Sequence, residues 1–467
     1  MPPRRPAAPS EAFPALDTLE ATLQDWLAVA QEPLPSSTAQ RGRGRPPVLP
    51  AMLLWSGLLV CILRGFRAQL DLWRLLTQQG LWHFPRVNVC DMAVYNRLER
   101  SSSAGMQHLL EQVTQAIQAA WPDLSSVTYA RFATAIVALD RTTLDPLLRK
   151  LKLLRNVPPG TASLLAGTLT CLFDLRRQQW LRVEFDRDAT QNEKKDVARM
   201  LTGLAAGTLL LFDLGYFSFP WLDTLTQAGY FFVTRFREKV SYEIVHRLYE
   251  GTQHGVALLD ALVYLGVHRA DRAAHAVRLI QVQVGSATYR YLTNVLDPRE
   301  LPAWQVAGLY QRRWDIERAF RLLKGQLGLQ LLFSARPNVV LLQVFATLVI
   351  AQVVLALRTR AAQLAGVNLR EVSLELLLRW LPQVGADGED PLAWFVARGR
   401  AAGFIRPFRG KQYLVPRIPE EEYTLPEHPP PKRKARYAGK QGTHPKARPR
   451  RQRPNARAGS RAKDPTM

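Results

Sequence analysis

Ala135-Ile-Val-Ala-Leu-Asp140 marks the point where the hydrophobic pattern of the chain changes from helical to strand-like. Two apolar segments follow at Leu164–Leu175 and Trp180–Phe185, and in the second of them apolar residues alternate with Arg182 and Glu184. Alternation with a period of two is the pattern of a half-buried strand. We therefore predict three successive strands with tight connections, the first of them starting at about residue 132.

The elements beyond the third strand alternate between helix and strand. In chain order they are a helix at 190–204, a buried strand at 208–212, a helix at 219–228 and a strand at 230–236. Strand patterns return within 237–298, and a long helix is expected over about 302–328. Three strands followed by alternating helices and strands predict an α/β fold with a mixed sheet.

The regions on either side of this segment are expected to be helical. Residues 46–130 carry apolar side chains at helical spacing, and further helices are expected over 331–427. Residues 1–45 form an N-terminal segment that ends in a basic linker. The apolar run Val339–Leu357 is long enough to cross a bilayer, but Gln343 and Gln352 lie about 180° apart on a helix, so we expect a buried core helix and no membrane span.

The charge of the chain points to a polyanionic partner. The 467 residues include 62 Lys and Arg against 39 Asp and Glu, a formal charge of +23. A surplus of this size is most often matched by nucleic acid. The three cysteines, Cys61, Cys90 and Cys171, form no CxxC pair and no disulfide framework, so a reduced intracellular setting and no structural zinc site are expected.

The C-terminal segment 428–467 is the most basic part of the chain. It contains thirteen Lys and Arg, one acid (Asp464) and seven prolines. Because it has few apolar side chains with which to offset its ordering entropy, we expect it to be disordered. It is either a sequence-blind arm for DNA phosphates or a solubilising tail.

A short basic motif lies in the N-terminal linker. The run Arg41-Gly-Arg43-Gly-Arg45-Pro46 resembles an AT-hook, in which extended Arg-Gly-Arg-Pro enters a narrow minor groove. Arg43 and Arg45 are therefore candidate DNA-binding residues. The alternative interpretation is a solvated basic linker.

Two acidic residues follow predicted strands. Asp140 ends the first strand and Asp213 ends the strand at 208–212. Sites form beyond the carboxyl ends of neighbouring parallel strands, so the two carboxylates could converge on a metal. The alternative for each is a turn or helix-cap residue.

The strongest indication of a functional site is a stripe of polar residues along one face of the predicted helix. Tyr310-Gln-Arg-Arg313-Trp-Asp-Ile-Glu317-Arg-Ala-Phe-Arg-Leu-Leu-Lys324 places Arg313, Glu317 and Lys324 at about 300°, 340° and 320° from Tyr310. Arg312 and Asp315 point elsewhere, so Arg312 would serve as a control for the stripe. One acid among three donors suggests a carboxylate held beside a phosphate, and the alternative is an exposed charged helix face.

These motifs together resemble the insertion-sequence-4 family of DDE transposases. The spacing Y-x2-R-x3-E-x6-K is the family signature and is matched at every position. Leu139-Asp140-Arg141-Thr142 is similar to the first family block, and Phe212-Asp213-Leu214-Gly215-Tyr216 is similar to the second. Arg235 and Leu292-Thr293-Asn294 are weaker similarities. The resemblance covers about 132–328.

The resemblance implies a ribonuclease H-like catalytic core over 131–330, with a β-rich insertion at about 237–298 and a helical DNA-binding region at 46–130. Its acids, Asp140, Asp213 and Glu317, would hold two Mg²⁺ ions, with Mn²⁺ as a substitute, and hard carboxylate oxygens suit these ions. Tyr310, Arg313 and Lys324 would hold DNA phosphates. The segment 237–298 lacks the Trp that some relatives use in hairpin formation, so the strand chemistry stays open.

The implied function is metal-dependent cleavage and transfer of DNA strands at the ends of an insertion sequence. The implied partners are double-stranded DNA, both the terminal inverted repeats and the target, and a second copy of the chain in a synaptic homodimer. The expected location is the cytoplasm, on chromosomal DNA. The alternative is a catalytically inactive DNA-binding protein derived from a transposase.

Overall fold

The structure is a computed structural model that describes residues 48–66, 68–81, 84–144, 167–186, 197–267, 271–329, 331–334, 336–384, 390–408 and 415–437. The AT-hook-like residues Arg43 and Arg45 lie outside these ranges, as does the rest of the segment 1–45. The first part of the helix expected at 190–204 and the tail from residue 438 lie outside them as well.

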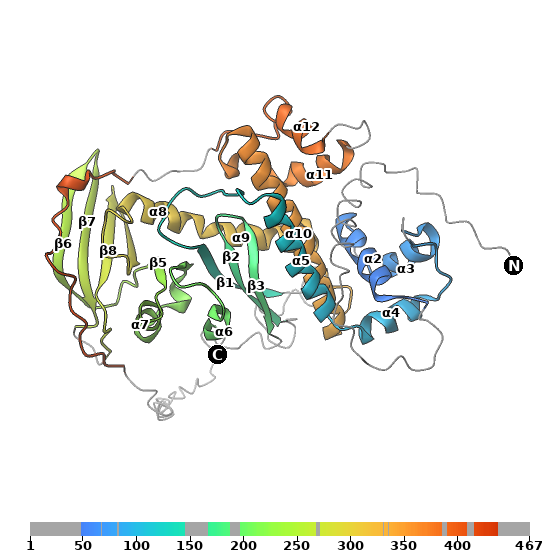
Figure 1. Cartoon of the computed structure of the whole chain (residues 1–467), viewed down its shortest axis with the longest axis horizontal. Coiled ribbons are helices and arrows are strands. Elements are labelled where there is room, and N and C mark those ends of the chain that lie inside the picture. Colours follow the sequence, from blue (N-terminus) through green and yellow to red (C-terminus); the bar gives the residue numbers. More distant parts are fainter. Residues whose placement is uncertain are drawn as a thin grey trace, which may run out of the picture.

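Nine strands form one sheet. They are β1 (Ile136–Leu144), β2 (Gly167–Asp174), β3 (Gln179–Asp186), β4 (Leu209–Phe212), β5 (Phe231–Arg235), β6 (Tyr242–Gln253), β7 (Val256–Leu265), β8 (Val277–Val284) and β9 (Ala287–Thr293). Their order is β3-β2-β1-β4-β5-β9-β8-β7-β6 (Figure 1). Strands β1, β4 and β5 are parallel, and all other neighbours are antiparallel. The predicted α/β class with a mixed sheet is confirmed.

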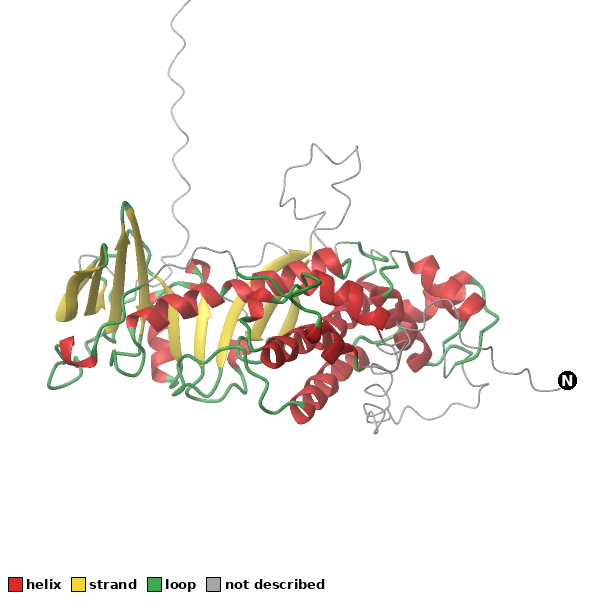
Figure 2. Cartoon of the chain, turned by 90° about the horizontal axis from the view of Figure 1, so that it is seen from above, coloured by secondary structure: helices red, strands yellow, loops and turns green. Residues whose placement is uncertain are grey.

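Helices occupy both faces of the sheet centre and one end of the molecule (Figures 1 and 2). The N-terminal group is α2 (Ala51–Leu63), α3 (Gln69–Arg74), η1 (Leu75–Gln79), α4 (Asp91–Arg100) and α5 (Ala104–Ala120). Within the sheet region lie α6 (Val197–Leu201), η6 (Leu214–Tyr216) and α7 (Phe219–Gln227). The remaining helices are α8 (Ala303–Arg312), α9 (Trp314–Arg321), η7 (Leu322–Gln326), α10 (Pro337–Ala365), η8 (Leu369–Glu371), α11 (Leu374–Val384), α12 (Pro391–Ala397) and η10 (Glu420–Glu422).

The first strand separates two hydrophobic cores. Ile136 and Ala138 face the core that includes α2, α5 and α8–α10, whereas Val137 and Leu139 face the core formed with α6 and α7. Successive side chains of a strand point to opposite faces, so a strand covered on both sides is apolar throughout. This is why the central strands appear in the sequence as uninterrupted apolar runs.

Helix α10 is the core helix that the sequence predicts. It is long and apolar enough to cross a membrane, but 94% of its apolar window is buried inside the protein. Gln343 donates to the Leu331 carbonyl at 2.7 Å, and the Gln352 side chain accepts from the Trp180 backbone N–H at 2.9 Å. These amides are therefore used inside the fold, where an unpaired polar group would be costly. Helix α10 ends at Gly366, which has the left-handed φ of +61° that favours glycine.

The C-terminal segment departs from the expectation of disorder. Residues 428–437 are described, and they contact the end of β7 and the segment that leads into β8. Arg436 forms a β-bridge with Arg272, and the Tyr437 hydroxyl donates to buried Asp223 at 2.6 Å. The Arg433 side chain donates to the carbonyls of Leu265 and Ala273. This stretch has few apolar side chains, but backbone pairing and hydrogen bonds to buried acceptors stabilise it. The predicted disorder from His428 is therefore wrong for this stretch.

Candidate functional site

The two strand-associated acids occupy adjacent positions across the sheet. Parallel strands β1 and β4 pair from Ile136 opposite Leu209 to Leu139 opposite Phe212, and Asp140 and Asp213 are the next residue on each strand. The sequence places Asp140 at the end of its strand, and this is wrong. Strand β1 runs on to Leu144 because its second half keeps pairing with β2. Both acids nevertheless lie where the parallel pairing stops.

A basic residue, Arg235, occupies the equivalent position after the pairing of the neighbouring strand β5. Phe212 pairs with Thr234 of β5, so Arg235 follows the pairing just as Asp213 does. Arg235 is exposed and close enough to act on the pKa of Tyr310. The sequence identifies Arg235 only as a weak family similarity, although its place after an apolar strand is the same signal that identifies the two acids. Asn294, the other weak similarity, accepts from the Phe232 N–H at 2.8 Å and has a structural role at β5.

Tyr310 brings α8 to the second acid. Its hydroxyl donates to the Asp213 carboxylate at 3.2 Å, and its ring packs against Tyr291 with centroids 5.4 Å apart. Burial is the main cause that raises the pKa of the phenol well above its usual range, while Arg313 opposes the shift and Asp213 adds to it, so the phenol stays a hydrogen-bond donor at neutral pH. The side chain is therefore positioned and protonated beside Asp213.

Arg313 lies between the other two acids. Its guanidinium is 3.2 Å from Asp140 and 2.8 Å from Glu317, and the residue is only 4% exposed. Burial opposes its charge, but the neighbouring acidic groups outweigh burial and raise the pKa of Arg313. Its buried Nε has no hydrogen-bond partner among the described atoms. Arg313 lies between α8, which ends at Arg312, and α9, which begins at Trp314, and its backbone angles are those of a right-handed helix.

The carboxyl of Asp140 has a raised pKa. Burial raises its pKa from 3.8 to about 6, and the charges of Glu317 and Asp213 act in the same direction. The backbone N–H of Arg141 and the guanidinium of Arg313 lower it in part. Glu317 and Asp213 therefore both lie near enough to Asp140 for their charges to act on its carboxyl.

A cleft of about 560 Å³ opens beside two of these acids. Asp140 and Glu317 line it together with Lys324, whose ammonium group lies 2.5 Å from the Thr142 hydroxyl. Three segments that are far apart in sequence thus meet: β1, the edge after β4, and the helix from α8 to η7. The residues that the helical stripe selects face this edge, and Tyr310 and Arg313 are buried, so the alternative of an exposed charged face does not hold for them.

On the opposite face of the same helix, two charged residues lie away from the stripe, as the helical spacing predicts. Arg312 and Asp315 point away from the cleft and pair with each other at 2.5 Å. Arg312 is 7% exposed and also donates a hydrogen bond to the Ser126 carbonyl. It therefore has a structural role and is not a suitable control for substitutions in the stripe.

The acids fit a divalent cation by their chemistry, because carboxylate oxygens are the ligands that Mg²⁺ and Mn²⁺ prefer. Within the part of the chain that the structure describes, no three His, Cys, Asp or Glu side chains are gathered as a ready-made metal cluster. Instead, the guanidinium of Arg313 neutralises Asp140 and Glu317.

A cleft at the carboxyl edge of parallel strands that is lined by two acids, two arginines and Lys324 is an arrangement suited to a protein that handles phosphate esters. Residues 166–352 match the family model described as the Transposase DDE domain, a range that contains Asp213 and Glu317 but begins after Asp140. This match supports a transposase family and a transposase function for the chain.

Two individual proteins are similar to the chain. The protein "Putative transposase y4zB" of Sinorhizobium fredii (strain NBRC 101917 / NGR234) is 28% identical over 164 residues, which are 35% of this chain and 45% of that protein. The chain therefore matches less than half the length of this relative. A cryo-EM structure of the piggyBac transposase synaptic complex with hairpin DNA aligns over 85% of this chain and 84% of its own, with 10% identity and a TM-score of 0.38.

Proposed function

We propose that the chain is a DNA transposase of the insertion-sequence-4 type, which cleaves DNA strands at the ends of its element and joins them to target DNA. The observation that carries the proposal is the pair of contacts that Arg313 makes, with Asp140 at 3.2 Å and with Glu317 at 2.8 Å. Asp213 follows the strand beside Asp140 and accepts a hydrogen bond from Tyr310. A ribonuclease H-like core is supported by the strand order β3-β2-β1-β4-β5 with three parallel strands at its centre. Strands β6 to β9 would be the β-rich insertion.

The three acids would hold two divalent ions, Mg²⁺ or Mn²⁺. When bound, these ions would activate the attacking hydroxyl or water and stabilise the leaving oxygen. Because Arg313 pairs with Asp140 and Glu317, it would exchange those carboxylates for a DNA phosphate when the ions are present. A guanidinium binds a phosphate with the same paired donors that it uses for a carboxylate.

The other polar residues of the cleft would position the DNA strand. Lys324 would bind a phosphate as a point charge at the open side of the cleft, and the Tyr310 hydroxyl would hold Asp213 in orientation. The partners would be the terminal inverted repeats, the target DNA and a second copy of the chain. We expect the protein to act in the cytoplasm, on chromosomal DNA.

The test is nicking of supercoiled plasmid DNA by the full chain in Mg²⁺ or Mn²⁺. Asp140→Asn, Asp213→Asn and Glu317→Gln should each abolish nicking and leave DNA affinity nearly unchanged, because affinity comes mainly from Lys and Arg. Glu375→Gln, in an exposed ion pair with Arg379, is the matched control and should nick normally. Normal nicking by any of the three variants would remove that residue from the site. DNA binding without nicking by the unmodified chain would favour the inactive, DNA-binding alternative.

A further inference from the structure

A second pocket lies against α8, whereas the cleft that holds Asp140 is lined by β1, α9 and η7. Its volume is about 490 Å³, within the range of roughly 300–1,000 Å³ typical of small-ligand sites. Gly308 and Gln311 of α8 form one wall, Gln363 of α10 forms another, and the segment 125–129 closes a third side. The pocket shares no lining residue with the cleft that holds Asp140.

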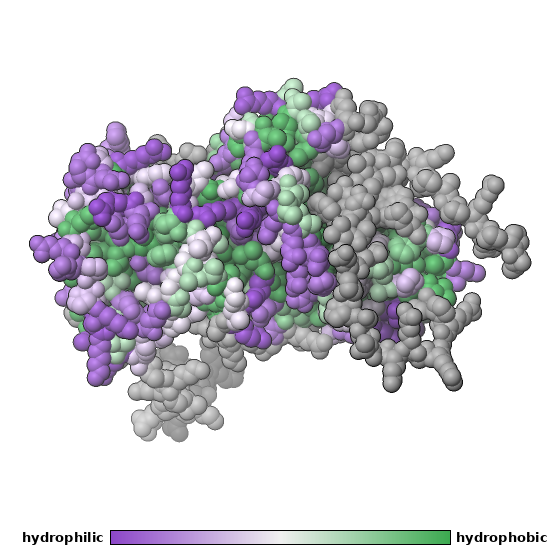
Figure 3. Space-filling view, viewed as in Figure 1, coloured by the Kyte–Doolittle hydropathy of each residue, from purple (hydrophilic) through white to green (hydrophobic). Residues whose placement is uncertain are grey.

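The pocket is lined by positive charge. Arg312, Arg370 and Arg417 reach it from three separate segments, and no acidic side chain lines it among the described residues. The guanidinium of Arg417 lies over the ring of Trp304 at 4.5 Å, and Trp304 also lines the pocket. On the face seen in Figure 3, hydrophilic side chains gather over α8.

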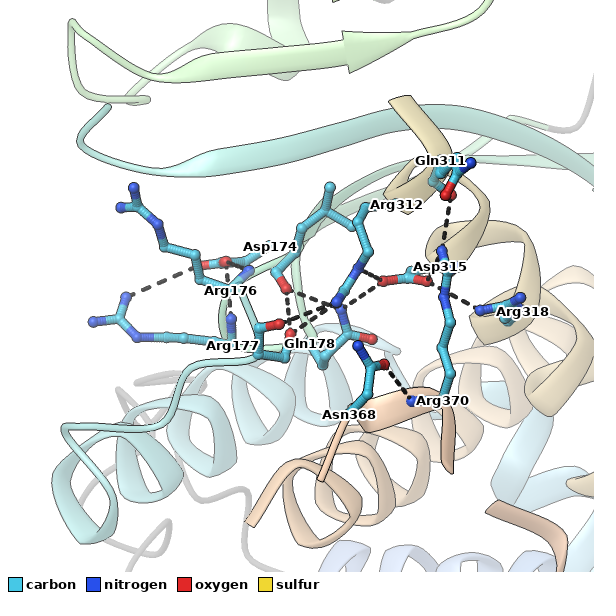
Figure 4. Close-up of polar contacts among 12 residues, drawn as sticks. Asp174, Arg176, Arg177, Gln178, Gln311, Arg312, Asp315, Arg318, Asn368 and Arg370 are labelled. Carbon is cyan, nitrogen blue, oxygen red and sulfur yellow. Dashed lines mark hydrogen bonds and ion pairs between the residues drawn. The ribbon is translucent and has the colours of Figure 1, made fainter. Parts of the chain in front are cut away.

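Positive charge exceeds negative charge around Asp315, the ion-pair partner of the pocket residues Arg312 and Arg370. Asp315, which is 4% exposed, forms ion pairs with three arginines (Figure 4): Arg312 at 2.5 Å, Arg318 at 3.4 Å and Arg370 at 4.0 Å. A fourth, Arg358, is close enough for its pKa to respond to Asp315. One carboxylate therefore faces four guanidinium groups.

Two of these arginines have a lowered pKa. Burial is the main cause that lowers the pKa of Arg358 to about 10, while Asp315 raises it and the neighbouring guanidinium groups lower it. The pKa of Arg370 is lowered for the same reasons. In addition, the buried Nε of Arg370 and the buried Oε1 of Gln363 have no hydrogen-bond partner among the described atoms. The unpaired buried N–H of Arg370 and the excess positive charge are costly unless a negatively charged acceptor satisfies them.

We propose that this pocket binds the phosphate group of a nucleotide. Guanidinium groups are the preferred partners of phosphate, and an anion here would balance the charge around Asp315. The volume exceeds what a phosphate alone needs, and Trp304 and Tyr129, in edge contact at 5.4 Å, offer aromatic surface to the attached base. The nucleotide is either a unit of a DNA strand or a free nucleotide. The inference does not depend on strand cleavage, because the two sites share no residue.

The experiment measures binding to the full chain in EDTA, so that the cleavage proposal is not involved. The probes are a 5′-phosphorylated DNA duplex, dAMP and inorganic phosphate. Arg417→Gln and Arg370→Gln should each weaken binding at least tenfold. Arg247→Gln, which removes an equal charge from an exposed ion pair on β6, should change it less than twofold. Arg417 is exposed, so this variant should fold even if Arg370→Gln does not, and thermal melting checks both.

The three probes distinguish the source of the phosphate. Weakened binding of the duplex alone assigns the pocket to a DNA strand, and weakened binding of dAMP or phosphate as well assigns it to a free nucleotide. If Arg417→Gln folds and binds all three probes as the unmodified chain does, or if the unmodified chain binds none of them, the proposal is wrong.

Discussion

The guanidinium of Arg313 lies 3.2 Å from the carboxylate of Asp140, a residue 173 positions earlier in the chain. This contact joins the helix of the polar stripe to the strand that carries the first acid. It also makes Arg313 a poor probe of function, because its loss would leave Asp140 and Glu317 buried or half-buried without a partner. The more exposed members of the cleft give cleaner tests.

Lys324→Met should slow Mg²⁺-dependent DNA nicking about a hundredfold and change the free energy of unfolding by less than about 1 kcal/mol. A lost phosphate contact beside developing charge costs about 3 kcal/mol in the transition state, whereas a half-exposed charge contributes little to folding. Nicking rates and urea unfolding measure the two effects. Arg379→Met, in an exposed pair with Glu375, is the control. Equal nicking rates for both variants would mean that Lys324 does not touch the reacting strand.

Asp315→Asn should destabilise the protein more than Arg312→Met. Breaking a buried ion pair costs roughly 3–5 kcal/mol when it leaves an uncompensated charge. Arg312→Met leaves Asp315 with Arg318 and Arg370 as partners, but Asp315→Asn leaves several guanidinium groups without their common carboxylate. Urea unfolding at neutral pH gives the order. The reverse order would show that Asp315 does not neutralise the arginine cluster.

Asp140→Asn should stabilise the metal-free protein at pH 7, and the gain should disappear in acid. Burial raises the pKa of Asp140 from 3.8 to about 6, so the charged form is disfavoured in the folded state. The folded state holds the proton more tightly, and stability therefore rises as the pH falls from about 6 to about 4. The difference corresponds to roughly 3 kcal/mol. Thermal melting of both proteins in EDTA across this range measures it, and a gain that persists at pH 4 would contradict the explanation.

Two truncations should separate the two parts of the C-terminal segment. Ending the chain after Tyr437 removes nine Lys and Arg and should reduce the slope of log affinity for DNA against log salt, without lowering the melting temperature. Ending it after Glu427 should also lower the melting temperature, because the Tyr437–Asp223 hydrogen bond and the Arg433 contacts are lost. An unchanged salt slope in the first truncation would mean that residues 438–467 do not contact DNA.

The sequence by itself determined strands β1 to β5, the core helix and the residues that are proposed for the site. Apolar runs such as Leu209–Phe212 and the alternation within Trp180–Phe185 depend on local periodicity, and the structure has strands at both. The helical spacing of Tyr310, Arg313 and Glu317 likewise fixes which face they share, because a helix turns by a constant angle per residue. This spacing alone places Asp315 on a different face of the helix from Glu317.

Only the tertiary structure decided which of these faces meet. The pairing of Leu139 with Phe212 sets Asp140 beside Asp213, and the packing of α8 brings Tyr310 and Arg313 onto the same edge. The extension of β1 to Leu144, the burial of Arg312 and the docking of Tyr437 on Asp223 were likewise not predictable. Each of these features depends on a partner that is distant in sequence. Local periodicity does not predict which distant backbone group or carboxylate a residue contacts in the folded chain.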